Sequence, residues 1–135
     1  MSNTQAERDR LNQLSNTIIG AAIDVHRELG PGMLESAYKA SLAFELTSRG
    51  MSVEREKPVP LVYKSHRLDC GYRVDLIVDN SVVVEVKAID RLARVHGAQL
   101  VSYLKQLKLK LGLLINFNVS LLRDGIERKV NGFPE

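Results

Sequence analysis

The sequence predicts a single α/β domain, a mixed β-sheet flanked by helices, over residues 1–135. Three observations lead to this fold class: helical apolar spacing through the first fifty or so residues, strand-like alternation from Met51, and one more helical segment before the last strands. The chain has the length of one domain, and no linker rich in Pro, Gly or Ser divides it.

The first half of the chain predicts two helices. Apolar residues recur at helical spacing from Leu11 to Leu29, and Gly30-Pro31-Gly32 ends that run. Glycine suits the left-handed position after a helix, and proline just beyond cannot continue it. A second helix is expected from about Leu34 to Arg49, before Gly50.

The second half predicts strands around a third helix. The strongest strand pair is expected at Arg67–Val78 and Val82–Ile89, on either side of Asp79-Asn80-Ser81. A compact apolar strand at Leu113–Val119 is expected inside the sheet, because fully buried strands read as continuous apolar runs. The other expected elements are strands at Val53–Lys57, Val59–Tyr63 and Ile126–Val130, a turn at Ser65-His66, and a helix at about Leu92–Leu109.

Composition excludes several classes of protein. The chain is 44% hydrophobic and 26% charged, which is ordinary for a globular domain, and no apolar run approaches the ~18 residues of a membrane span. The polar start, Met1 to Arg10, predicts no signal peptide. The single cysteine, Cys70, is expected to be a small buried group, and its lack of a disulfide partner predicts a cytoplasmic location.

Charge differs between the two parts of the chain. Residues 1–56 hold 6 basic and 8 acidic side chains, a balance of −2, and residues 57–135 hold 13 and 8, a balance of +5. The stretch from Arg91 to Lys110 contains no acid at all. Such a basic field attracts a polyanion, although charge alone favours an ordinary solvated helix face.

Three charged residues lie where a buried strand would carry apolar ones. Asp75 falls inside the run Tyr72–Val78, and Glu85 and Lys87 share one face of the next strand. Carboxylates are poor strand formers and are costly to bury without a partner. These positions therefore require a compensating interaction.

The length of the loop between the strands decides whether the two carboxylates meet. Directly opposed residues of an antiparallel pair point to the same face. A three-residue loop at Asp79–Ser81 would pair Val78 with Val82 and therefore Asp75 with Glu85. A two-residue loop would send Glu85 to the other face. We predict the three-residue loop.

Two neighbouring carboxylates need a proton or a cation. At about 5 Å they repel by roughly 3 kcal/mol at an effective dielectric near 20. Either the pKa of one carboxyl rises, or a cation lies between them: Lys87, or a divalent metal, for which oxygen ligands favour Mg²⁺ or Mn²⁺ over zinc. Cross-strand salt bridges on a solvent-facing sheet are an equally good interpretation of the spacing.

Helical spacing adds polar residues to this region. His96, Gln99 and Tyr103 lie on one face of the third helix and could face the same cleft as Glu85. Taken alone, a Gln and a Tyr four residues apart favour surface exposure instead. Glu35 and Tyr38 are similarly spaced on the second helix.

The segment Gly32-Met33-Leu34-Glu35-Ser36-Ala37-Tyr38 combines Gly, Glu and Tyr at intervals of three residues. By this complete motif the chain resembles the small GxxExxY proteins, a branch of the PD-(D/E)xK nuclease-like superfamily. Asp75 matches the superfamily aspartate, although Val74 precedes it instead of proline, and Glu85-Val86-Lys87 matches the (D/E)xK element. Further matches are Gln99-x-x-x-Tyr103 and the late core strand Leu113-Leu114-Ile115-Asn116-Phe117.

The resemblance implies a restriction-endonuclease-like core, α-β-β-β-α-β, with an extra N-terminal helix and added strands. It implies an enzyme that hydrolyses a phosphodiester bond in DNA or RNA with water activated by Mg²⁺ or Mn²⁺. The alternative is a non-catalytic nucleic-acid- or protein-binding module on the same scaffold. No membrane partner is expected, and the oligomeric state is open, a homodimer included.

The resemblance also assigns residue roles. Asp75, Glu85 and the carbonyl of Val86 would hold the metal, and Glu35 would complete the site directly or through water. Lys87 would orient the attacking water, and Gln99 and Tyr103 would position water or a phosphate oxygen. The nucleic-acid backbone would be held beside the cleft by basic residues of the acid-free stretch, namely Arg91, Arg94, His96 and Lys105.

Overall fold

A five-stranded mixed sheet forms the centre of the protein in the computed structural model, which describes residues 3–134. The elements are α1 (Asn3–Leu29), α2 (Glu35–Ser48), β1 (Val53–Pro58), β2 (Leu61–Tyr63), β3 (His66–Leu68), β4 (Arg73–Val78), β5 (Val82–Lys87), α3 (Arg94–Leu107), β6 (Leu111–Asn116), the 3-10 helix η1 (Leu122–Gly125) and β7 (Ile126–Val130). This confirms the predicted fold class.

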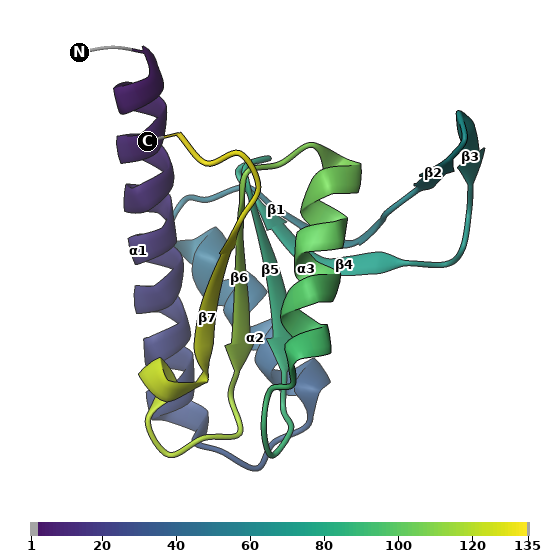
Figure 1. The fold of residues 1–135 in the computed structure, drawn as a ribbon. Coiled ribbons are helices and arrows are strands. Elements are labelled where there is room, and N and C mark those ends of the chain that lie inside the picture. The colour runs from purple at the N-terminus through teal and green to yellow at the C-terminus, as the bar shows by residue number, and fades with distance from the viewer. Residues whose placement is uncertain (1–2, 135) are drawn as a thin grey trace.

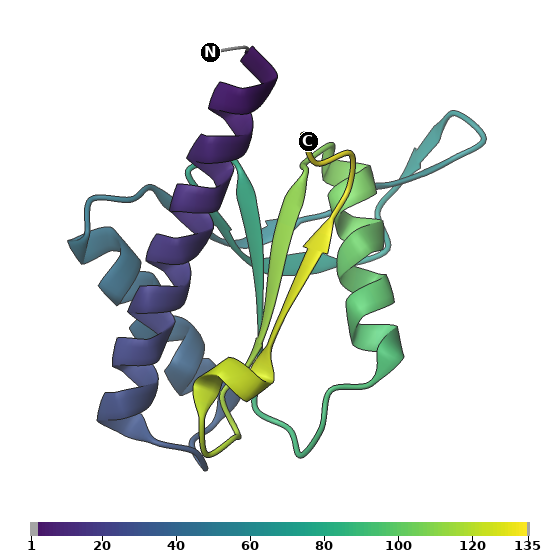
Figure 2. The same ribbon diagram turned by 60° about the vertical axis from the view of Figure 1, so that its left-hand side comes forward.

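Helices cover both faces of the sheet. The strand order is β1-β4-β5-β6-β7, with β5 and β6 parallel and the other pairs antiparallel. Leu76 and Val84 pack in the core formed with α1 and α2, whereas Ile77 and Val83 pack against α3. Figure 2 shows this arrangement, with α1 and α2 on one side of the sheet and α3 on the other. All six residues of β6 are buried, as predicted for a strand inside the sheet.

The first helix is longer than its apolar pattern predicts. Periodicity marks only the part of α1 that lies on the sheet, but the helix begins at Asn3. Polar contacts hold its N-terminal part: Lys110 pairs with Glu7 at 2.6 Å, and Arg10 donates to Ser81 Oγ at 3.0 Å. No helix within residues 3–134 is long and apolar enough to cross a membrane.

The predicted strand at Arg67–Val78 is wrong as a continuous element. It is divided into β3 and β4, because Gly71, with φ of 76°, turns the chain between them. β2 and β3 form a hairpin around Lys64 and Ser65, one residue earlier than the predicted turn, and Figure 1 shows this hairpin projecting from the body of the protein. Cys70 lies in the segment after β3 and is exposed, so its predicted burial is also wrong.

The register between β4 and β5 is the predicted one. Val78 pairs with Val82, Ile77 with Val83 and Leu76 with Val84, so the connecting loop has three residues. Asp79 and Asn80 both adopt positive φ in this turn, a conformation that Asp and Asn tolerate better than most residues. The register directs Asp75 and Glu85 toward each other.

Candidate active site

The two buried carboxylates lie where β4 and β5 separate. The ladder between these strands ends at Leu76 and Val84, one step before Asp75 and Glu85. Beyond that point the Asp75 amide donates to Glu85 Oε1 at 3.1 Å, and the Val86 amide donates to Asp75 Oδ2 at 2.7 Å. Each carboxylate therefore takes the place of a missing ladder partner, and the predicted meeting of the two side chains is confirmed.

Burial separates the two interpretations of this pair. Asp75 is 8% exposed and Glu85 is 7% exposed. Ion pairs on a solvent-facing sheet would leave both side chains in water. The pair belongs instead to an interior gap in the sheet, where each charge requires compensation.

The electrostatics of the gap favour uptake of positive charge. Burial and the negative charge of Asp75 together raise the pKa of Glu85 to about 8, although the hydrogen bond from the Asp75 amide and the charge of Lys87 act in the opposite direction. At neutral pH the pair therefore tends to retain one proton unless a cation offsets the second charge.

One cation already touches the pair, and sequence reasoning missed it. Lys39 Nζ on α2 lies 3.1 Å from Asp75 Oδ1 and 2.8 Å from Glu56 Oε1. Burial lowers the pKa of Lys39, but hydrogen bonds with Glu56 and Asp75 and the charges of both outweigh it, so the pKa is raised. The available signal was its position four residues after Glu35, on the same helix face.

Lys87 has an ammonium without a fixed partner. Its side chain is half-buried at the end of β5, and among residues 3–134 it forms neither a hydrogen bond nor an ion pair. Its charge nevertheless reaches Glu85, whose pKa it lowers. Lys87 is therefore close to the carboxylate pair and available to a ligand.

The oxygen atoms of the gap suit a hard divalent cation. The Val86 amide faces Asp75, and because the N–H and C=O of a strand residue point to one edge, the Val86 carbonyl faces the same gap. Mg²⁺ is commonly held by one or two carboxylates and retains several waters. The two carboxylates and this carbonyl fit such an ion, with Lys39 as a competitor for one Asp75 oxygen.

Glu35 does not join the carboxylate pair directly. It is the first residue of α2 and is half-buried, and among residues 3–134 no three His, Cys, Asp or Glu side chains are grouped closely enough to hold a metal ion.

Other residues of the Gly32–Tyr38 segment have structural roles. The Tyr38 hydroxyl donates to Gly30 O and accepts from Met33 N, and its ring stacks on Phe117 with 4.6 Å between centroids. Gly32 has a φ of 99°, which favours glycine. These contacts fix where α2 begins, and with it the position of Lys39.

The polar residues of α3 divide between the site and the surface. Tyr103 is buried, and burial and the charges of Glu85, Tyr72 and Asp75 raise its pKa, which places its hydroxyl near the carboxylate pair. Gln99 is exposed and lines a pocket together with Tyr103. The His96 Nδ1 accepts from the Ala93 amide at 2.9 Å and so caps the start of α3.

The acid-free stretch does not lie along one side of the site. Arg91, Arg94 and Lys105 are exposed. Lys110, however, pairs with Glu7 and precedes Leu111, which is opposite Val82 at the far end of β5 from Lys87. The expectation that the stretch from Arg91 to Lys110 lies beside the cleft is therefore wrong at Lys110, which lies at the other end of β5 from Lys87.

Asn116 is a second residue that sequence reasoning did not single out by itself. Its side chain is 2% exposed, donates to Ile89 O at 2.9 Å, and accepts from the Ile89 and Asn118 amides. It ties the segment after Lys87 to the end of β6. A polar residue at the end of an apolar strand was the available signal.

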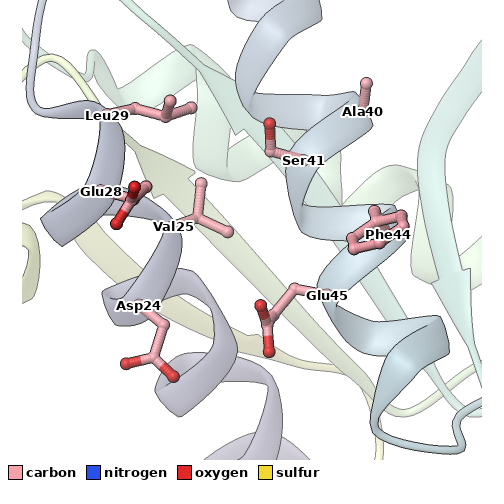
Figure 3. Close-up of a pocket in the computed structure, with 8 residues that line it drawn as sticks. All are labelled: Asp24, Val25, Glu28, Leu29, Ala40, Ser41, Phe44 and Glu45. Atoms are coloured by element: carbon pink, nitrogen blue, oxygen red, sulfur yellow. The ribbon is translucent and has the colours of Figure 1, made fainter.

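A separate pocket of about 510 Å³ lies between α1 and α2, away from these residues. Figure 3 shows Asp24 and Glu28 on one helix and Phe44 and Glu45 on the other. Arg49 pairs with both Asp24 and Glu45. None of the site residues that the sequence predicts lines this pocket.

Comparison with known proteins identifies the wider family. A family model described as the PD-(D/E)XK nuclease superfamily matches residues 12–129. No curated protein and no solved structure matches the chain. The matched range includes the carboxylate pair, both lysines beside it and all of α3.

Proposed function

Because the chain belongs to the PD-(D/E)XK nuclease superfamily, we propose that it is a metal-dependent nuclease that hydrolyses a phosphodiester bond in DNA or RNA. The observation that carries the proposal is the buried pair of Asp75 and Glu85 in the gap between β4 and β5, with Lys87, which forms no ion pair among residues 3–134, beside it. An anionic nucleophile approaches an anionic phosphate poorly, so catalysis requires concentrated positive charge.

The residues around the gap would have separate roles in binding the metal and in orienting the water and the phosphate. Asp75, Glu85 and the Val86 carbonyl would hold the cation, Mg²⁺ or Mn²⁺. A divalent ion, when bound, lowers the pKa of a water and offsets negative charge on the phosphate. Lys87 would donate to the attacking water or to a phosphate oxygen, since its ammonium has no partner among residues 3–134.

The other residues predicted from the sequence would act from positions around the gap that holds Asp75 and Glu85. Tyr103 and Gln99 would position water or a phosphate oxygen, and Glu35 would act through water, since it is not in the group formed by Asp75 and Glu85. Arg91, Arg94, His96 and Lys105 would contact the nucleic-acid backbone, with His96 using the ring nitrogen that does not accept from Ala93.

The proposal is tested with labelled single-stranded, duplex and flap DNA and with RNA, in Mg²⁺, Mn²⁺ or EDTA. We expect cleavage that EDTA abolishes and that falls at least 100-fold in Asp75→Asn and in Lys87→Met. Asp90→Asn, an exposed acid just past β5, is the matched control and should cut normally. Absence of cleavage of every substrate in both metals would contradict the enzyme assignment.

A second candidate follows from Lys39. Because this ammonium already contacts Asp75, the gap could be neutral without a metal, as in a binding module that retains the scaffold. Calorimetric titration with Mg²⁺ separates the two candidates. An enzyme should bind Mg²⁺ with loss of binding in Asp75→Asn and tighter binding in Lys39→Met, which releases one Asp75 oxygen. A binding module should bind nucleic acid but no Mg²⁺ in either the wild type or Lys39→Met.

The finer assignments belong to this proposal. Membership of the GxxExxY branch is supported by the complete motif from Gly32 to Tyr38. Nucleic acid is the proposed partner, and a cytoplasmic location is proposed from the single cysteine, which has no disulfide partner in the sequence.

A further inference from the structure

A pocket of about 310 Å³ opens between the base of the β2–β3 hairpin and α3. Its apolar side is formed by the segment that leads into the hairpin, its aromatic side by two tyrosines, and its rim by polar residues of α3. The lining residues are Val59, Pro60, Leu61, Tyr72, Gln99, Ser102, Tyr103 and Gln106. This volume lies at the small end of the usual range of ligand pockets, roughly 300–1,000 Å³.

The pocket adjoins the carboxylate pair. Tyr103 forms part of its wall, and the charges of Glu85 and Asp75 act on the hydroxyl of that tyrosine. Tyr72 stands three residues before Asp75, about 10 Å along extended chain. A phosphodiester at Asp75 and Glu85 would therefore place its adjoining nucleoside at the pocket.

The aromatic side offers a stacking surface. The rings of Tyr72 and Tyr103 are 6.0 Å apart and tilted by 54°, and Tyr72 remains 46% exposed. Although aromatic residues make up only 5% of the chain, these rings gather at one place. Stacking on an exposed ring is open to every base, because each base has a π-face.

The polar rim can read the edge of a base. Gln99 makes no hydrogen bond among residues 3–134, so its amide has both a donor and an acceptor to offer. Gln106, which also lines the pocket, accepts from the Val62 amide through Oε1 at 3.3 Å, which ties the hairpin to α3, and its NH₂ group makes no hydrogen bond among residues 3–134. The pocket is thus held open between two elements.

Charge around the pocket suits a nucleotide better than an apolar peptide. Residues 61–73 contain Lys64, Arg67 and Arg73 against one acid, Asp69, and all three cations are exposed. Within the described part of the chain none of the three forms an ion pair, and Lys64 lies over the Tyr63 ring at 5.5 Å. Phosphates flanking a bound base would meet this positive segment.

We propose that this pocket binds one unstacked nucleobase of the nucleic-acid strand, next to the phosphodiester held at Asp75 and Glu85. The proposal rests on the nuclease function proposed above. Since a paired base must first leave its stack, at a cost of a few kcal/mol, single strands and unpaired junctions bind better than continuous duplex.

The test measures binding without cleavage, in Asp75→Asn and, independently, in the wild type with EDTA. DNA and RNA oligonucleotides carry 2-aminopurine at successive positions. We expect a fluorescence change at one position, and a loss of affinity of about tenfold or more in Tyr72→Ala, because base stacking is worth roughly 1–3 kcal/mol. Tyr63→Ala, which removes an exposed tyrosine of β2 outside the pocket lining, is the matched control and should lose much less.

An oligonucleotide with an abasic site at the position that responds completes a double-mutant cycle with Tyr72→Ala. It should weaken binding to the wild type but leave Tyr72→Ala unaffected, since the same contact is already absent. Equal weakening by Tyr72→Ala on normal and abasic strands, or no effect on either, would overturn the pocket assignment. Cleavage that is indifferent to Tyr72→Ala leaves the nuclease standing without the pocket, whereas position-specific binding without any cleavage leaves the pocket standing without the nuclease.

Discussion

At Glu85, burial and a neighbouring charge act in the same direction. Both disfavour the ionised carboxylate, and the pKa rises to about 8. Lys39 relieves Asp75, its direct partner, and Lys87 opposes the shift without a direct ion pair. The gap is thus an unfavourable place for two negative charges in the unliganded protein, which is the physical reason that it would take up a cation.

The raised pKa of Glu85 predicts that the free energy of unfolding falls as pH rises in the absence of metal. Folded Glu85 binds its proton more tightly than the unfolded chain does, so its stabilising effect is complete below about pH 4.5 and is lost as pH rises to about 8. The change is at most about 1 kcal/mol per pH unit. Urea unfolding between pH 5 and pH 8 in EDTA measures it.

The control for this pH dependence is a pair of neutralising variants. Glu85→Gln should flatten the profile, whereas Glu127→Gln, on the partly exposed Glu127 of β7, should leave it unchanged. Addition of Mg²⁺ at pH 8 should restore stability to the wild type. A profile as steep in Glu85→Gln as in the wild type would show that another group is responsible.

At the scale of single elements, the start of α2 depends on Tyr38. Its hydroxyl satisfies Gly30 O and Met33 N, and Tyr38→Phe would leave both groups without that partner while retaining the stacking on Phe117. We expect a loss of about 1–3 kcal/mol in the free energy of unfolding, measured in urea. Tyr63→Phe, an exposed tyrosine, should change it very little. Equal effects of the two substitutions would contradict the structural role of Tyr38.

Two glycines test the packing around β6. A Cβ on Gly125 would overlap the backbone carbonyl of Asn116, the residue that holds the segment after β5. Gly125→Ala should therefore cost several kcal/mol and lower the melting temperature by about 10 °C or more. A Cβ on Gly97, inside α3, meets the flexible Lys129 side chain at 2.6 Å and Glu127 Oε1 at 3.6 Å, and the gain in helix propensity offsets these side-chain contacts. Calorimetry that finds equal losses for the two variants would contradict this difference.

The meeting of Asp75 and Glu85 was predictable because it depends only on a loop length and the two-residue period of a strand. Lys39 was not predictable in the same way, since its contact depends on how α2 lies over the sheet. The break between β3 and β4 escaped prediction because the residues from Arg67 to Val78 read as a strand, although residues 69–72, with Gly71 at positive φ, turn the chain between the two strands. Local sequence patterns thus predict strand registers, whereas long-range packing decides which lysine contacts Asp75.

At the scale of the whole molecule, positive charge is concentrated in residues 57–135, with a balance of +5, and the carboxylate gap lies within that part of the chain. Exposed cations lie in two segments: Arg91 and Arg94 follow β5, and Lys64 and Arg67 belong to the β2–β3 hairpin that projects in Figure 1. Lys110, by contrast, is neutralised by Glu7. A polyanion should therefore be held by a few contacts around the gap, with a modest dependence on salt.

This distribution of exposed cations predicts how strongly nucleic-acid binding depends on salt. The logarithm of the affinity for single-stranded DNA should fall linearly with the logarithm of salt concentration, by about 0.7 for each phosphate contact. The double substitution Arg91→Gln/Arg94→Gln should therefore reduce the slope by about 1.4, as measured by fluorescence anisotropy in EDTA. Lys110→Gln should leave the slope unchanged, because that lysine lies at the opposite end of β5 and is paired with Glu7. If Lys110→Gln flattened the slope while the double variant left it unchanged, the strand would cross the other end of the sheet, and neither arginine would belong to the binding surface.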